Sequence, residues 1–134
     1  MDTIFALATP EGKSGVAIIR VSGKNAFKLF EKFSCPPVKP NGMGLRKLIV
    51  DNKLLDEALI LCFGEGHSFT GEKVVEIHHH GSLAIIHVCL SVLGSISDFR
   101  MANPGEFTKR AFEHGRLDLS QVEGLSALID AETT

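Results

Sequence analysis

The sequence has 134 residues, with 14 lysines and arginines against 16 aspartates and glutamates and a net charge of -2. This length fits one ordinary domain with a sizeable core, and 44% hydrophobic against 22% charged residues excludes a disordered chain. The near-balanced charge excludes a global basic field, so any nucleic-acid contact would be local or made by another part of a larger protein.

The first predicted elements are two strands, over residues 3–8 and 16–21, joined by the loop TPEGKSG at residues 9–15. This loop contains Gly12-Lys13-Ser14, which matches the end of a nucleotide-phosphate loop. Such a loop needs a glycine five residues before the Gly-Lys pair and a helix after it. Here Leu7 takes the glycine position and the β-branched run VAIIRV follows, so we interpret the segment as a hairpin loop.

A helix and a hairpin come next. Residues 25–33 predict a helix that Ser22-Gly23 can cap, with an inward face of four residues, namely Ala26, Phe27, Phe30 and Phe33. Residues 34–44 hold three prolines and two glycines and predict a loop. Residues 45–50 and 57–63 predict the two strands of a hairpin that turns around residues 51–53.

The second half begins with GEGHSFTG at residues 64–71, which starts like a dinucleotide-binding fingerprint. Its third glycine is spaced too far and a strand follows, so a loop is the better interpretation. Residues 73–79 predict a strand, and Ser82 can cap a helix that runs to about Leu93 and ends at Gly94. The inward residues of this helix are predicted to be Leu83, Ile86, Leu90 and Leu93.

The last predicted elements are a short strand over residues 99–102 and a helix that begins at Glu106 and is interrupted near His114-Gly115. A final helix carries a broad apolar stripe to the end of the chain, made of Leu119, Val122, Leu125, Leu128 and Ile129. The elements together predict an α+β fold with a mixed, largely antiparallel sheet and packed helices.

The cysteines and the start of the chain indicate the compartment. Cys35, Cys62 and Cys89 are odd in number, widely spaced and lack a C-x-x-C pair, which is typical of free thiols in a reducing compartment. The apolar run IFALA has no basic region ahead of it and is not a signal peptide, and the longest apolar runs are too short to cross a bilayer. We therefore expect a cytoplasmic protein with no membrane partner.

Three consecutive histidines, His78 to His80, raise the possibility of a metal site. Side chains alternate along a strand, so Glu76, His78 and His80 share one face and His79 lies on the apolar face with Val75 and Ile77. A metal-binding enzyme that uses Glu76, His78 and His80 is therefore one alternative, although a structural zinc site would need a fourth ligand. We expect His79 to be a hydrogen-bonded core histidine.

Residues 104–133, PGEFTKRAFEHGRLDLSQVEGLSALIDAET, form the most specific stretch. A helix can start at Gly105 and Glu106. Cations near the start of the following helix come from Lys109, Arg110 and Arg116. On periodicity alone this is a helical hairpin with solvated charges.

Three motifs carry a family resemblance, and they stand in the same order and spacing as in that family. They are DTIFALATPEGKSGVAIIRVSG, SFTGEKVVEIHHHG and NPGEFTKRAFEHGRLDLSQVEGLSALIDAET. With them the chain resembles the N-terminal domain of the tRNA modification GTPases of the MnmE family, also called TrmE. The resemblance covers essentially the whole chain, and residues 34–56 match only in general character.

The resemblance implies a fold similar to the tetrahydrofolate-binding domain of the glycine-cleavage T protein family, and dimerisation through this domain. It divides the chain into a tetrahydrofolate-binding domain at residues 1–117 and the first helix of a larger helical domain at residues 118–134. In the family that helical domain carries an inserted GTPase domain, which binds GTP, Mg²⁺ and K⁺ and lies outside this chain. We therefore expect no GTPase activity from these 134 residues, although the full-length parent is an enzyme.

The family's implied role is to build a carboxymethylaminomethyl or aminomethyl-type group at C5 of the wobble uridine in tRNA, together with the FAD-dependent partner MnmG. The one-carbon unit comes from a tetrahydrofolate derivative, of the 5-formyl or methylene type. The positions that match the family's folate contacts are Arg20, Glu76 and Arg116, with no catalytic residue or metal ligand among them. A carboxylate can accept the donors on a pterin edge, and guanidinium groups suit the acidic glutamyl tail or the carbonyl of the one-carbon unit.

Two segments depart from the family pattern, Lys13-Ser14-Gly15 and His79-His80-Gly81-Ser82, and bulkier residues near Glu76 would narrow the pocket. A stand-alone folate-dependent one-carbon transferase is a second alternative, because that fold is shared. The apolar stripe over residues 119–129 argues against it, since we expect a complete enzyme to cap such a helix.

Overall fold

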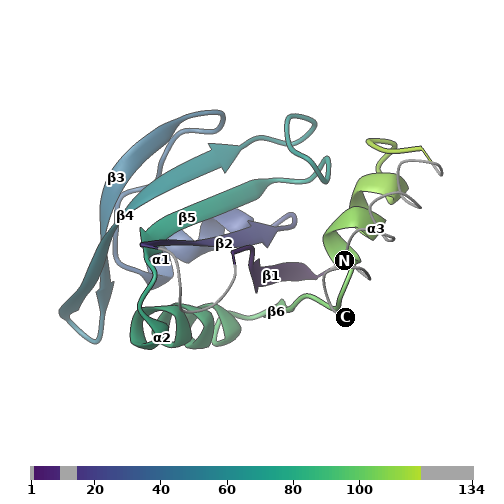
Figure 1. The fold of residues 1–134 in the computed structure, drawn as a ribbon. Helices are drawn as coiled ribbons and strands as arrows, with labels where there is room; N and C mark the ends of the chain where they lie inside the picture. Colours follow the sequence, from purple (N-terminus) through teal and green to yellow (C-terminus); the bar gives the residue numbers. More distant parts are fainter. Residues whose placement is uncertain (1, 10–14, 119–134) are drawn as a thin grey trace.

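The computed structural model describes residues 2–9 and 15–118, which form a six-stranded sheet with helices beside it (Figure 1). The strands are β1 (Thr3–Leu7), β2 (Val16–Ser22), β3 (Met43–Val50), β4 (Lys53–Phe63), β5 (Val74–His80) and β6 (Phe99–Met101). The helical elements are the 3₁₀ turn η1 (Ala26–Lys28), α1 (Leu29–Lys32), α2 (Leu83–Gly94) and α3 (Glu106–Glu113). The final predicted helix and Gly12-Lys13-Ser14 lie outside the described residues.

The sheet has the strand order β3-β4-β5-β2-β1-β6. In the described part of the chain its neighbouring strands are antiparallel except β1 and β6, which run parallel. This confirms the predicted α+β class with a mixed, largely antiparallel sheet. No helix in the described ranges is long and apolar enough to span a membrane.

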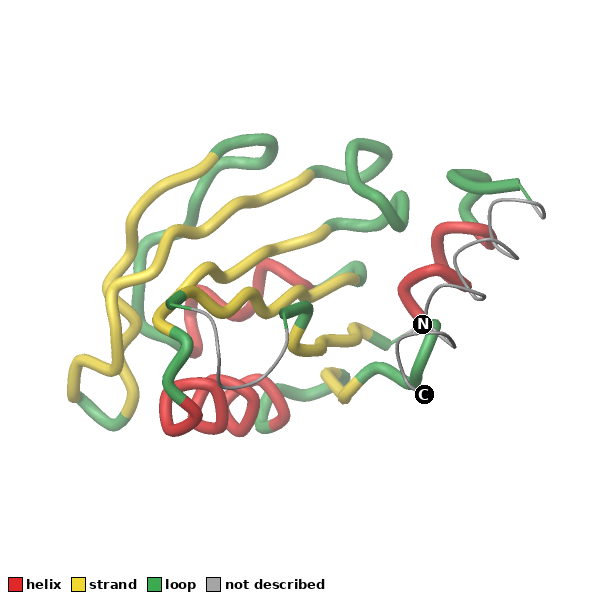
Figure 2. Tube along the Cα trace, viewed as in Figure 1, coloured by secondary structure: helices red, strands yellow, loops and turns green. Residues whose placement is uncertain are grey.

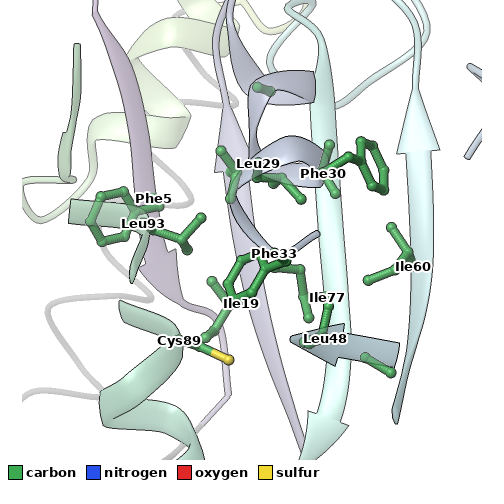
Figure 3. Close-up of a cluster of buried hydrophobic side chains, with 14 of the residues drawn as sticks. Phe5, Ile19, Leu29, Phe30, Phe33, Leu48, Ile60, Ile77, Cys89 and Leu93 are labelled. Atoms are coloured by element: carbon green, nitrogen blue, oxygen red, sulfur yellow. The ribbon is translucent and has the colours of Figure 1, made fainter. Parts of the chain in front are cut away.

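One face of the sheet is the core face, and α1 and α2 pack on it. Its buried side chains come from alternate positions of the central strands, such as Ile19 and Val21 in β2 and Val75 and Ile77 in β5, all 0% exposed. Phe30 and Phe33 of the α1 segment, with Cys89 and Leu93 of α2, complete the cluster (Figure 3). The strand residues between these positions point to the opposite face, called the open face below.

All three cysteines are free and buried, which confirms the prediction that they are not paired. Burial raises the pKa of Cys62 to about 11 and that of Cys89 to about 12. Both thiols therefore stay protonated near neutral pH and serve as core side chains.

The β3–β4 hairpin is longer than predicted because its turn is tighter. Asp51 and Asn52 both adopt positive φ angles, of 51° and 64°, and Val50 pairs with Lys53. Two central residues with positive φ make the turn that best matches the twist of the flanking strands, and Asp and Asn tolerate that conformation. Lys53 is therefore the first residue of β4, and the prediction that the strand begins at residue 57 is wrong.

The helices differ from their predictions in detail. Residues 26–32 form a 3₁₀ turn followed by one short α-helical turn, and the side chain of Ser22 bonds elsewhere instead of capping them. Ser82 caps α2 as predicted, since its side chain accepts a hydrogen bond from Ile85 N at 3.3 Å. The prediction that Leu83 points inward is wrong, because 48% of it is exposed at the first turn.

Candidate functional site

Arg20 and Glu76 face each other across neighbouring strands on the open face. The register of β2 and β5 places the two residues directly opposite, although they are 56 positions apart in the sequence. Arg20 Nε and Nη2 each lie 2.9 Å from Glu76 Oε2. The side chain of Glu76 is only 17% exposed, so this ion pair is partly shielded from water.

Glu76 has a second polar neighbour on its own strand, because His78 Nε2 lies 3.1 Å from Oε1. Burial by itself would raise the pKa of Glu76, but the hydrogen bonds from His78 and Arg20, and the charge of Arg20, outweigh it. The pKa of Glu76 is therefore below its ordinary value, and the group is an anion at neutral pH. Its role in a site would be that of a hydrogen-bond acceptor.

Two cavities meet at Arg20. One has a volume of about 390 Å³ and the other of about 540 Å³. The smaller one is lined by Arg20, Phe63, His67, Ser68, Phe69, Thr70, Val74 and Glu76. The larger one is lined by residues 6–8, 102–105, 107 and 108 together with Arg20 and Phe69. Arg20 and Phe69 belong to both linings, so the two cavities adjoin each other, and they are called the two compartments of the groove below.

A more voluminous groove, of about 1060 Å³, lies between α1 and α2 and includes neither Arg20 nor Glu76 in its lining. Its charged residues, such as Lys28, Glu31 and Lys32, are exposed. A partly buried ion pair beside aromatic side chains is the stronger sign of a ligand site than size alone.

Arg116, the third residue of the predicted site, contacts the β4–β5 loop. It follows α3 and is exposed, and its Nη1 donates a hydrogen bond to Gly66 O at 3.2 Å. Among the described residues it belongs to the lining of neither compartment. The structure thus brings Arg20 and Glu76 together and places Arg116 against the loop that joins β4 and β5.

The side chains of the three consecutive histidines make different contacts, as the alternation along a strand predicts. His78 points to Glu76, whereas His80 pairs with Asp56, with 2.8 Å between Nδ1 and Oδ1. His79 is 3% exposed on the core face, where its Nδ1 lies 2.7 Å from His80 O, which confirms the predicted core histidine. Within residues 2–9 and 15–118, no three side chains of His, Cys, Asp or Glu are grouped so that they could hold a metal ion.

A buried polar cluster beside the groove was missed by the sequence analysis. It joins Ser22 of β2, Thr70 and Glu72 of the β4–β5 loop and Arg110 of α3, and each of these residues is at most 8% exposed. One signal was present in the sequence, because Arg110 lies next to Ala111 on the face of α3 that must pack inward. An arginine on such a face indicates a buried acidic partner.

Comparisons with known proteins identify the family of this chain. A family model described as "GTP-binding protein TrmE N-terminus" matches residues 3–116. A protein of Cereibacter sphaeroides named tRNA modification GTPase MnmE is 50% identical over 133 residues, and one of the same name from a Ruegeria species is 51% identical over 134 residues. Each match covers 99% of this chain, which spans 31% of the length of either relative. The chain therefore belongs to the family of TrmE N-terminal domains.

Proposed function

We propose that this chain is the N-terminal module of a tRNA modification GTPase, and that it binds a one-carbon tetrahydrofolate and mediates homodimerisation. The observation that carries the folate proposal is the Arg20–Glu76 pair in a groove with aromatic walls. Pockets of about 300–1,000 Å³ with mostly apolar walls and a few convergent polar groups are typical of small-molecule sites. The two compartments, of about 390 and 540 Å³, fall in this range.

Glu76 suits the pterin end of a folate. Oε2 already accepts a hydrogen bond from Arg20 Nε and lies 2.9 Å from Nη2, and Oε1 lies beside His78. Each carboxylate oxygen has two lone pairs, so Oε1 retains capacity for one N–H donor of a ligand ring. The nearby Phe63 and Phe69 offer flat apolar surfaces for the ring itself. This geometry supports one hydrogen bond from the ligand to Glu76 Oε1 instead of a bidentate interaction with both carboxylate oxygens.

Arginine side chains would hold the opposite, acidic end of the ligand. Arg20 stands between the two compartments and can reach a carbonyl or carboxylate in either. Arg116 uses one of its five N–H donors on Gly66 O and is exposed, so it remains a candidate for the glutamyl tail. The bound folate would supply the one-carbon unit, and the residues of this chain would bind and orient it.

We propose that the open face of β3 and β4 supports homodimerisation. Met43 and Leu45 on the edge strand are 68% and 62% exposed, and they pair with Leu61 and Leu59 of β4 on the same face. Exposed apolar side chains that adjoin one another on a sheet edge are typical of a protein interface. Light scattering at increasing protein concentration tests this, and a monomer at every concentration would count against it.

The remaining activities belong, in this proposal, to parts of the parent protein beyond these 134 residues. GTP hydrolysis with Mg²⁺ and K⁺ would be carried out by a separate GTPase domain. The FAD-dependent partner MnmG and the tRNA would join in the full complex, with the wobble uridine as the modified base. A labelled GTP analogue should therefore show no binding to this chain at micromolar concentration.

Calorimetric titration with 5-formyltetrahydrofolate tests the folate site. Glu76→Gln should weaken binding by roughly 1.5–3 kcal/mol, the range for a hydrogen bond to a charged group, which is about 10- to 150-fold in Kd. The matched control is Glu57→Gln, which changes an exposed glutamate of β4 outside both compartments. Arg116→Gln should cost less, because water screens exposed ion pairs. Equal affinities of the Glu76→Gln variant and the unmodified chain would refute the assignment.

A further inference from the structure

The β4–β5 loop, residues 64–73, forms one wall of the groove. Three consecutive loop residues, Ser68, Phe69 and Thr70, line the compartment that holds Glu76. Phe69 also lines the other compartment, and 45% of this large aromatic side chain is exposed. The position of the loop therefore sets where an aromatic surface stands beside Arg20.

A closed ring of hydrogen bonds fixes the loop to the sheet. Glu72 N donates to Thr70 Oγ1 at 3.3 Å, and Ser22 Oγ donates to Glu72 Oε1 at 2.8 Å. Ser22 has only one hydroxyl hydrogen, so Thr70 is the donor in the 2.7 Å contact between Thr70 Oγ1 and Ser22 Oγ. Each hydroxyl in the ring both donates and accepts, an arrangement in which hydrogen bonds strengthen one another.

Arg110 joins this ring to α3. Its Nη1 lies 3.2 Å from both oxygens of Glu72 and donates to Asp2 O at 2.7 Å, and its Nη2 lies 3.1 Å from Asp2 Oδ1. The Arg110 side chain is 3% exposed and the Glu72 side chain is 9% exposed. Removing one partner of such a buried pair leaves an uncompensated charge, which is strongly destabilising locally.

The segment after α3 holds the loop from its other side. Gly71 has a φ angle of 83°, and a Cβ atom built there would lie 2.9 Å from His114 Cβ and 3.2 Å from Arg116 Cγ. Arg116 also donates to Gly66 O in the same loop. Figure 2 shows the β4–β5 loop and α3 at the same end of the sheet.

We propose that Arg110 and Glu72 are positioning residues of the ligand groove. They act through the ring of hydrogen bonds with Ser22 and Thr70, which holds Phe69 in its place beside Arg20. Docking of α3 and ligand binding are then coupled, and by linkage a bound ligand stabilises the docked helix. This inference rests on the proposed folate site for the identity of the ligand.

The test compares two neighbouring residues of α3. Arg110→Met removes the buried guanidinium, whereas Lys109→Met removes a cation whose side chain is 75% exposed. Calorimetric titration with 5-formyltetrahydrofolate should show about tenfold weaker binding for Arg110→Met, because a displaced Phe69 no longer packs against the ligand ring, and no change for Lys109→Met. Ser22→Ala, which changes a residue outside both compartments, should weaken binding in the same direction.

A second readout reports the position of the loop without any ligand. The chain has no tryptophan and no tyrosine, so Phe69→Trp introduces a single intrinsic fluorophore in the loop. In this background Arg110→Met and Ser22→Ala should increase quenching of the introduced tryptophan by acrylamide, while Lys109→Met should not. If Arg110→Met does not fold cooperatively, the positioning role is tested with Ser22→Ala, by its folate affinity and by the quenching of the introduced tryptophan.

Unchanged folate affinity and unchanged quenching in Ser22→Ala and Arg110→Met would overturn the positioning role and leave the folate site standing. No folate binding by the unmodified chain would instead refute the proposed function, and the coupling to a folate with it.

Discussion

The two faces of strands β2 and β5 differ in composition although they share one backbone. On the core face, Ile19 and Ile77 are fully buried under the helices. One residue along each strand, Arg20 and Glu76 form a partly shielded ion pair on the open face. A well-packed core on one side of a strand pair can therefore hold charged groups on the other side at a fixed distance, as a binding site requires.

The comparison predicts that stability resides on the core face and ligand recognition on the open face. Substitutions on the core face should lower the free energy of unfolding and leave the polar geometry of the surviving folded protein in place. Substitutions on the open face should change the polar geometry and leave the free energy of unfolding nearly unchanged. Strand β3 allows a matched pair, because it carries a leucine on each face.

The largest effect is expected for Leu48→Ala on the core face. Leu48 is 0% exposed, and Figure 3 shows it among the buried side chains of the cluster. Loss of the buried methyl groups and the cavity left behind should cost about 2–5 kcal/mol in the free energy of unfolding. Urea denaturation followed by circular dichroism measures this, and a cost below about 1 kcal/mol would contradict the assignment of Leu48 to the core.

A smaller effect is expected from His79, which is a polar group on the core face. Burial lowers the pKa of His79 below 6.5, despite the hydrogen bond to His80 O. Because the folded pKa is depressed, its contribution to stability is fully present above the unfolded pKa and is lost as the pH falls through the folded value. Stability should therefore decrease below about pH 6.5, by at most about 1.4 kcal/mol per pH unit for one proton.

The control for this pH dependence is His79→Leu, which removes the titrating ring and also the buried Nε2, an atom with no hydrogen-bond partner in the described structure. Urea denaturation of both proteins at pH 7.5 and pH 5.5 isolates the contribution of His79 to the pH dependence of stability. The same loss of stability in both proteins would show that His79 is not responsible.

The smallest effect on folding is expected for Leu45→Ala. Leu45 lies on the open face of β3 and is 62% exposed. Its truncation should change the free energy of unfolding by no more than about 0.5 kcal/mol, as for other surface positions. Denaturation at a low protein concentration checks this value, and a cost close to that of Leu48→Ala would remove the distinction between the two faces.

Much of the fold could be predicted from the sequence, because its signals are local. The alternation of β5, the Ser82 cap of α2 and the strand that follows the Gly-Lys-Ser loop each depend on neighbouring residues. The early start of β4 could not be predicted, because it depends on positive φ angles at Asp51 and Asn52 that the fold selects. Phe33 was predicted to be core and the equally buried Leu29 was not, although the spacing of Ala26, Leu29, Phe30 and Phe33 along the helix places Leu29 on the same face.

The candidate site was less predictable from local patterns. Arg20 and Glu76 were singled out by family resemblance, and only the sheet register shows that they touch. Arg110 and Glu72 are 38 residues apart and have no local reason to meet. Such pairs are set by tertiary packing, which a single sequence does not contain.

The parallel pairing of β1 with β6 has a consequence for the order in which the chain assembles during synthesis. Thr3 pairs with Phe99, and Asp2 contacts both Arg100 and Arg110. Strand β1 therefore keeps one edge without its native partner until about a hundred further residues have been synthesised. Contacts this distant in sequence form slowly, because the chain between them must first be ordered. The last step of sheet formation thus coincides with the arrival of α3.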